Sequence, residues 1–282
     1  MRTLAALAVA VAAAVALAGC GGSSSSASSK PKPATKVNVV ARKPTAPSGG
    51  TISVVYDRPA NSADAEAEAV LKNGGTDALA KDFTQAFVLP SNITIHAVNQ
   101  FVGPNWDPST STITLSYQFV QYIAGVLRQS FPALNGNQFE FGKEIAAVDA
   151  FVATHELGHA LIRVFGLPVL GKEEDAADSL AAVFLTKFVP GGDGFSFDAA
   201  KFFHGMSARQ RKLAPSDYWD VHSLDQQRAY EIVCWVAGSN QQDYQRVAQL
   251  RILGAPRLQT CPAEYQQKLQ SWTALLQPHF RR

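Results

Sequence analysis

The chain has 282 residues, a length that fits one large domain or two small ones and is ample for a hydrophobic core. Its composition, 46% hydrophobic and 17% charged, excludes a disordered or coiled-coil protein. The formal net charge is +2 and the basic residues are scattered, so we expect no nucleic-acid partner.

The first 19 residues have the pattern of a signal peptide. Arg2 supplies a positive charge, and an apolar run follows from residue 4 to residue 17. This run is shorter than the roughly 20 residues that a membrane-spanning helix needs. It ends in Leu17-Ala18-Gly19-Cys20, which resembles the lipobox of bacterial lipoproteins. The resemblance implies cleavage before Cys20 and a lipid on that cysteine, while an ordinary secretory signal cleaved near Ala18 or Gly19 is the alternative.

Either cleavage places the mature protein outside the cytoplasm. With the lipid, we expect it to be anchored to a bacterial membrane. Residues 20–50 are rich in Ser, Gly, Pro, Lys and Ala, a composition typical of a linker. Apart from Cys20, the chain contains Cys234 and Cys261, and an even pair in an oxidising compartment favours a disulfide between them.

Residues 51–282 are predicted to form an α+β domain that begins with a small antiparallel or mixed sheet. Alternation of apolar and polar residues predicts three strands, at 52–56, 93–98 and 112–117. Two helices are expected between the first two strands, at 63–71 and 76–87. We expect strands 93–98 and 112–117 to pair antiparallel across a turn-rich loop at 103–108.

A mainly helical body is predicted to follow the sheet. Helical spacing of apolar residues indicates three helices, at 121–131, 144–165 and 173–188. Ser223 is the expected N-cap of another helix, with Gln226 as its capping-box partner and Gly238 at its end. Pro262 is expected to open the last helix.

The helix predicted at 144–165 contains His155-Glu156-Leu157-Gly158-His159. Residues four apart share a helix face, so the two imidazoles are positioned to bind one Zn²⁺. The glutamate between them is then the general base for a water molecule. Apolar residues at matching positions indicate that both histidines point into the protein.

Zinc needs a third protein ligand and one open position for water. Glu174 and Asp178 are four apart in the next predicted helix, so both lie on one face. Glu174 is positioned to complete the coordination, and Asp178 to hydrogen-bond the outer ring nitrogen of a ligating histidine. Glu173 competes for the third position, but an alanine stands four residues after it.

HExxH followed by ExxxD resembles the glutamate-ligand branch of zinc metallopeptidases, the gluzincins. The wider stretch is similar to a bacterial domain family described as "putative metallopeptidases", whose members carry a run like Gly171 to Asp178. Further matches are Asp225-Gln226-Gln227-Arg228, Cys234-Trp235, Cys261-Pro262 and Glu264-Tyr265, so that the resemblance covers most of residues 90–280. No third histidine follows at the metzincin spacing, which excludes that branch.

The resemblance implies a zincin-like fold and one zinc ion held by His155, His159 and Glu174. It makes Glu156 the base and Asp178 the carboxylate behind a ligating histidine. Sites of this kind often present a donor to the developing oxyanion, and His222 and Tyr218 are the candidates. His204 is a weaker candidate, and His96 and His279 are expected to be structural or exposed.

The expected function is that of a lipid-anchored, zinc-dependent peptidase acting on a peptide or protein substrate. One alternative is a zinc amidase that acts on cell-wall peptides. The other is a binding or assembly lipoprotein that keeps the zinc site without turnover. Retention of Glu156 argues against this last alternative, because a purely structural zinc site needs no base.

Overall fold

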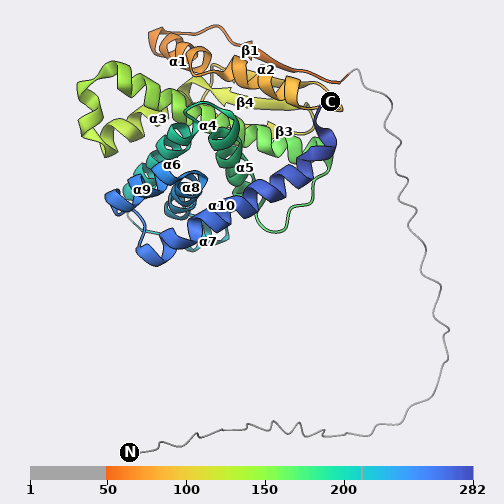
Figure 1. Cartoon of the computed structure of the whole chain (residues 1–282). Helices are drawn as coiled ribbons and strands as arrows, with labels where there is room; N and C mark the ends of the chain where they lie inside the picture. Colours follow the sequence, from red (N-terminus) through yellow and green to blue (C-terminus); the bar gives the residue numbers. More distant parts are fainter. Residues whose placement is uncertain (1–48, 211, 282) are drawn as a thin grey trace, which may run out of the picture. The chain divides into compact units, whose positions relative to one another are not determined.

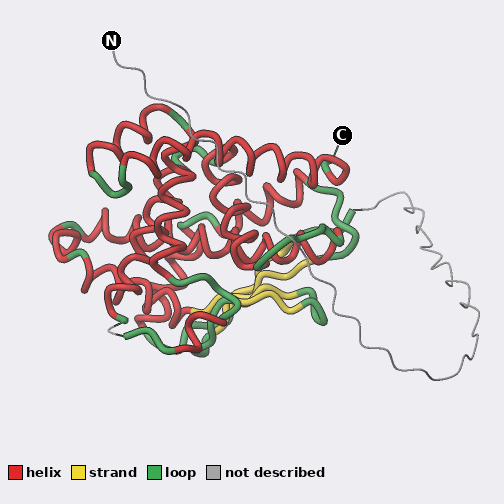
Figure 2. Tube along the Cα trace, turned by 90° about the horizontal axis from the view of Figure 1, so that it is seen from below, coloured by secondary structure: helices red, strands yellow, loops and turns green. Residues whose placement is uncertain are grey.

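The computed structural model describes residues 49–210 and 212–281. The expected signal peptide, Cys20 and nearly all of the expected linker lie outside the described residues. Within them, a small sheet is combined with ten α-helices, eight of which follow its last strand, and this agrees with the predicted α+β class (Figure 1). Figure 2 shows the sheet at one edge of the helical body.

The sheet has four strands in the order β1-β2-β4-β3. Their bounds are Ile52–Tyr56 for β1, Ile93–Val98 for β2, Asn105–Asp107 for β3 and Thr112–Ser116 for β4. The strands β1, β2 and β4 run parallel, and only β3 is antiparallel to its neighbour. The sheet is therefore mixed.

The expected antiparallel pairing of residues 93–98 with 112–117 is wrong. The two strands are parallel, with Ile95 opposite Ile113. The reason is β3, which lies in the segment that was expected to be only a turn-rich loop. It runs back along the sheet edge and pairs antiparallel with β4, so β4 again points the same way as β2.

One face of the sheet is apolar and buried. Ile95, Ala97, Ile113 and Leu115 alternate with threonine and histidine positions that are only partly buried. The buried face packs against the helices, among them α1 (Ser62–Asn73) and α2 (Thr76–Ala86), which connect β1 to β2. This arrangement anchors the sheet to the body that carries the site.

Eight further helices form the body (Figure 1). They are α3 (Tyr117–Ser130), α4 (Gln138–Phe165), α5 (Glu173–Phe188), α6 (Gly192–Arg209), α7 (Pro215–Trp219), α8 (Asp225–Ser239), α9 (Gln241–Leu250) and α10 (Ala255–Leu276). Three of these helices, α6, α7 and α9, were not predicted from the sequence. The start of α6 gives little helical signal, because its N-cap is Gly191 and its first residue is Gly192, and glycines are typical of a break between helices.

The helix α4 is the core of the body. Its residues from Ala147 to Ile162 are all buried. Among the described residues, α4 alone is long and apolar enough to cross a membrane, but 94% of its apolar window is buried inside the fold. It is therefore the central helix of a globular domain, surrounded by the other elements.

The helices α4 and α5 pack closely where small residues of both helices meet. A Cβ added to Gly158 would lie 3.3 Å from the Cα of Ala177. This close approach brings the first turn of α5 next to the histidines of α4.

The structure corrects the boundaries of α8. Leu224 is its N-cap, and Gln227 accepts a hydrogen bond from the Leu224 main chain, so the capping motif lies one residue later than expected. The Ser223 hydroxyl donates instead to Asp175, at 2.9 Å. Gly238 lies inside α8 rather than at its end, and α10 passes so near that a Cβ at this position would meet the carbonyl oxygen of Cys261.

The boundary of α10 also differs from the prediction. Pro262 lies within the helix, and the proline of the first turn is Pro256. The favoured disulfide between Cys234 and Cys261 is present and joins α8 to α10, with the two Cα atoms 5.0 Å apart.

Candidate metal centre

Two neighbouring helices carry the side chains that the sequence analysis assigned to a metal. The helix α4 holds His155 and His159 one turn apart, and the first turn of α5 holds Glu174. Nε2 of each histidine and Oε2 of Glu174 face one another, and we call these three atoms the ligand cluster. The two Nε2 atoms are 3.1 Å apart, and Oε2 lies 3.1 Å and 3.2 Å from them.

These separations suit one metal ion. Ligands about 2.0 Å from a tetrahedral Zn²⁺ lie about 3.3 Å from one another, close to the spacing in the cluster. When each Nδ1 donates to its own carboxylate, both Nε2 atoms and the Glu174 oxygen remain as acceptors that face each other. A cation between them satisfies all three acceptors, so the residues present fit zinc.

A carboxylate of α5 holds the outer nitrogen of each imidazole. Nδ1 of His155 lies 2.8 Å from Asp178 Oδ1, and Nδ1 of His159 lies 3.0 Å from Glu173 Oε1. Such contacts fix the ring orientation and leave Nε2 free for a metal. Glu173, the rival for the third ligand, thus contacts the outer side of His159, and it also pairs with Arg163.

Arg228, on α8, supports Asp178 from the other side. Its Nε and one terminal nitrogen lie 2.7 Å and 2.8 Å from the two carboxylate oxygens of Asp178, a bidentate pair. Its guanidinium also lies 3.9 Å from the ring centroid of Phe203. The role of Arg228 could not be predicted from the sequence, because its partner is 50 residues away and no spacing rule connects the two residues.

The electrostatics of the cluster favour bound positive charge. Burial opposes a charged imidazole at His155, but the Asp178 carboxylate outweighs this effect and raises the pKa of His155 to about 9. Burial also opposes charge on Glu174, yet hydrogen bonds from the surrounding histidines hold the pKa of Glu174 far below its usual range. The carboxylate is therefore ionised, as a metal ligand must be.

Glu156 lies next to the ligands on α4 and is 6% exposed. Burial raises the pKa of Glu156, and the neighbouring His155 and His159 offset part of that rise. Together with His155, it lines the cavity described below. A carboxylate with a raised pKa at such a wall suits the uptake and release of a proton.

The structure brings His222 to the cluster but leaves Tyr218 outside it. Nε2 of His222 lies 3.0 Å from Oε2 of Glu174, and its Nδ1 lies 3.2 Å from Oδ1 of Asp220. The hydrogen bond with Glu174 raises the pKa of His222, against the effect of burial. Tyr218 is 66% exposed, and its side chain makes no hydrogen bond or ring contact with any described residue.

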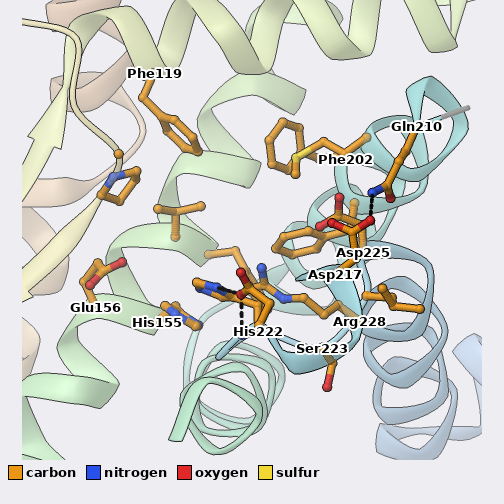
Figure 3. A pocket seen from close by; sticks show the side chains of 18 residues that line it. Phe119, His155, Glu156, Phe202, Gln210, Asp217, His222, Ser223, Asp225 and Arg228 are labelled. Carbon is orange, nitrogen blue, oxygen red and sulfur yellow. Dashed lines mark hydrogen bonds and ion pairs between the residues drawn. The ribbon is translucent and has the colours of Figure 1, made fainter. Parts of the chain in front are cut away.

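A cavity of about 380 Å³ opens beside the cluster (Figure 3). His155 and Glu156 lie along one side of it, and His222, Ser223 and Arg228 lie near them. Much of the remaining lining is apolar: Phe119, Phe151, Val152, Phe202, Phe203 and Met206. Its size is within the range of ligand-binding cavities, and His155 and Glu156 in its wall place it directly beside the cluster.

The remaining histidines singled out in the sequence lie outside the cluster. Nδ1 of His204 lies 3.1 Å from Gln226, and Nε2 of His96 lies 2.9 Å from Asp57. His279 stacks on an aromatic ring of α4. These three have structural partners of their own.

A family model described as "Putative metallopeptidase" matches residues 56–276 of the chain. The matched range contains the ligand cluster, the carboxylates behind it, His222 and Arg228. No curated protein and no solved structure matches the chain.

Proposed function

The chain belongs to the family described as "Putative metallopeptidase", and from this premise we propose that it is a zinc-dependent peptidase. One observation carries the proposal. His155, His159 and Glu174 present three ligand atoms to one point, and Glu156 stands beside them at the wall of a cavity. A site that served structure alone would need neither the base nor the cavity.

A bound zinc ion would supply the Lewis acidity of the reaction, by polarising the carbonyl of the scissile bond and acidifying water. Glu156 takes a proton from the water molecule as the water oxygen attacks the carbonyl carbon. It then delivers this proton to the amine nitrogen as the carbon–nitrogen bond breaks. The raised pKa of Glu156 suits both transfers.

His222 is the residue that we propose as hydrogen-bond donor to the oxygen that becomes negative during the attack. Its Nε2 lies 3.0 Å from a ligand atom of Glu174, at the edge of the same cavity. Carboxylates face both ring nitrogens of His222, Asp220 at Nδ1 and Glu174 at Nε2, and together they favour the doubly protonated ring, in which Nε2 carries a proton to donate. The exposed position of Tyr218 makes it the weaker candidate for this role.

We also propose that the protein works outside the cytoplasm, attached to a bacterial membrane by a lipid on Cys20. The lipobox-like sequence that ends at Cys20 supports this. The disulfide between Cys234 and Cys261 supports an oxidising compartment, because such bonds are rare in the cytosol. Replacement of Cys20 by alanine should move the protein from the membrane fraction to the soluble fraction; unchanged membrane association would refute the lipid anchor.

The central test compares the wild type with Glu156→Gln, both purified without chelators. Elemental analysis should find about one zinc ion per chain in both proteins, since Glu156 is not a ligand. Hydrolysis of a quenched fluorescent protein such as casein should be abolished in the variant. His155→Ala is the matched control, and it should lose both the zinc and the activity.

The outcomes separate the alternatives. Zinc without hydrolysis of any peptide in the wild type would favour the binding lipoprotein. Release of soluble fragments from purified cell wall, with no action on casein, would favour the amidase. Absence of zinc from the wild type would overturn the whole assignment.

A further inference from the structure

The loop that carries His222 has few contacts of its own. Residues 220–223 connect α7 to α8, and no main-chain hydrogen bond joins them to another segment of the described chain. Their apolar side chains do not hold them either, since Val221 is 66% exposed and the preceding Trp219 is 75% exposed. Something else must therefore fix the position of His222.

Two side chains that flank the ligand Glu174 supply these contacts. Nζ of Lys172 donates to the main-chain oxygen of Asp220 at 3.0 Å and to that of His222 at 2.8 Å. Asp175 accepts a hydrogen bond from the hydroxyl of Ser223 at 2.9 Å. The loop is thus held on both sides of His222.

We propose that Lys172 and Asp175 are positioning residues, which latch the loop 220–223 to the first turn of α5 and so place His222 beside Glu174. The first turn of α5 then supplies the metal ligand Glu174 and also holds His222, which faces this ligand. The separation of 3.0 Å between His222 Nε2 and Glu174 Oε2 is the distance that this latch maintains.

The geometry explains why the latch needs these residue types. Lysine has three donors on a flexible stem, so one side chain can bind two carbonyl oxygens of a loop. Asp220 further restricts the backbone of the loop, because its Oδ1 accepts a hydrogen bond from the His222 main-chain nitrogen at 2.8 Å. Lys172 itself comes directly before the first helical residue of α5, where its main chain is extended and its side chain can reach across.

Hydrogen exchange measured by mass spectrometry tests the latch independently of any activity. We compare zinc-loaded wild type with Lys172→Met, Asp175→Asn and Lys172→Arg. Loss of the two hydrogen bonds should speed exchange of the His222 amide, which donates to Asp220 within the loop, on the order of tenfold in Lys172→Met, with α4 unchanged. Lys172→Arg, which keeps the donors, should restore most of the protection.

Lys201→Met is the matched control. Lys201 also bridges two oxygens, those of Glu144 at 2.7 Å and Asp198 at 2.8 Å, but none of them belongs to the loop. This variant should leave exchange of the loop unchanged. Equal exchange in the wild type and Lys172→Met, or equal acceleration in the control, would overturn the latch.

The contribution of the latch to catalysis rests on the proposed function and is tested by a double-mutant cycle. Lys172→Met should lower kcat on the order of tenfold with KM and zinc content little changed, and it should cost almost nothing further in a His222→Ala background. An undiminished loss in that background would show that Lys172 acts by another route. If the wild type hydrolyses no peptide, the proposed function fails, while the exchange experiment still decides whether the latch exists.

Discussion

The pair of Arg228 and Asp178 offers the sharpest test of how the site is supported. The Asp178 side chain is 3% exposed and that of Arg228 is 10% exposed, so their bidentate contact is almost completely removed from water. Arg228→Met removes the guanidinium together with its contact to Phe203, and leaves the carboxylate with His155 as its remaining partner. Asp178→Asn removes the charge that Arg228 balances.

The magnitudes follow from burial. Removal of one partner of a buried ion pair typically costs about 3–5 kcal/mol, because the other charge is left uncompensated. Arg228→Met should therefore lower the free energy of unfolding by about that amount in the wild type, and by much less in Asp178→Asn. We expect a coupling energy of about 2 kcal/mol or more between the two sites. Either single change should also weaken zinc binding about 10–100-fold, because Asp178 orients His155.

Urea denaturation of the metal-free proteins gives the four stabilities of the cycle, and competition with a chelator gives the zinc affinities. Arg257→Met is the control, since Arg257 also contacts two carboxylates, Glu231 and Glu264, but these groups are more exposed and remote from the ligands. It should cost less than about 1 kcal/mol and leave zinc affinity unchanged. Strictly additive effects of Arg228→Met and Asp178→Asn would refute the supporting role of Arg228.

Three further predictions concern the body of the fold. Burial raises the pKa of Asp149 to about 7, so the native state binds more protons than the unfolded chain between about pH 4 and pH 7. The free energy of unfolding should therefore fall by up to about 4 kcal/mol as the pH rises through that window. Asp149→Asn should remove this dependence in denaturation curves measured from pH 4 to pH 8. Reduction of the disulfide between Cys234 and Cys261, which closes a loop with a sequence separation of 27, should lower stability by about 3.5 kcal/mol on the chain-entropy model, and an unchanged Tm in reducing buffer would contradict that. Gly238→Ala should lower the free energy of unfolding by about 2 kcal/mol despite the better helix propensity of alanine, because the new methyl group would meet the main-chain oxygen of Cys261. A stabilised protein in calorimetry would contradict this and show that α10 can move away.

The sequence predicted the parts of the site that follow local rules. His155, Glu156 and His159 occupy one turn of one helix, so their spacing alone indicates a shared face. Glu174 and Asp178 repeat that spacing in the next helix. The two helices approach closely at Gly158, where an added Cβ would lie 3.3 Å from the Cα of Ala177.

The contacts that cross longer distances in the chain were beyond prediction. Arg228 reaches Asp178 from another helix, and Lys172 reaches carbonyl oxygens of a loop 48 and 50 residues later. Such pairs depend on how the helices pack, and a single sequence contains no periodicity that reports it. The strand pairing failed for a similar reason, because the three residues of β3 were too few for a periodic signal yet reversed the direction of the chain.

The deep burial of α4 has a consequence for the way in which a metal would enter and leave. His155 and His159 lie on a helix whose residues cannot become exposed without loss of the core, so these two ligands form a rigid seat. Glu174 and His222 lie nearer the surface, with side chains 18% and 44% exposed. We therefore expect exchange of the metal to proceed through this more accessible side, at a rate set by local opening there rather than by global unfolding of the domain.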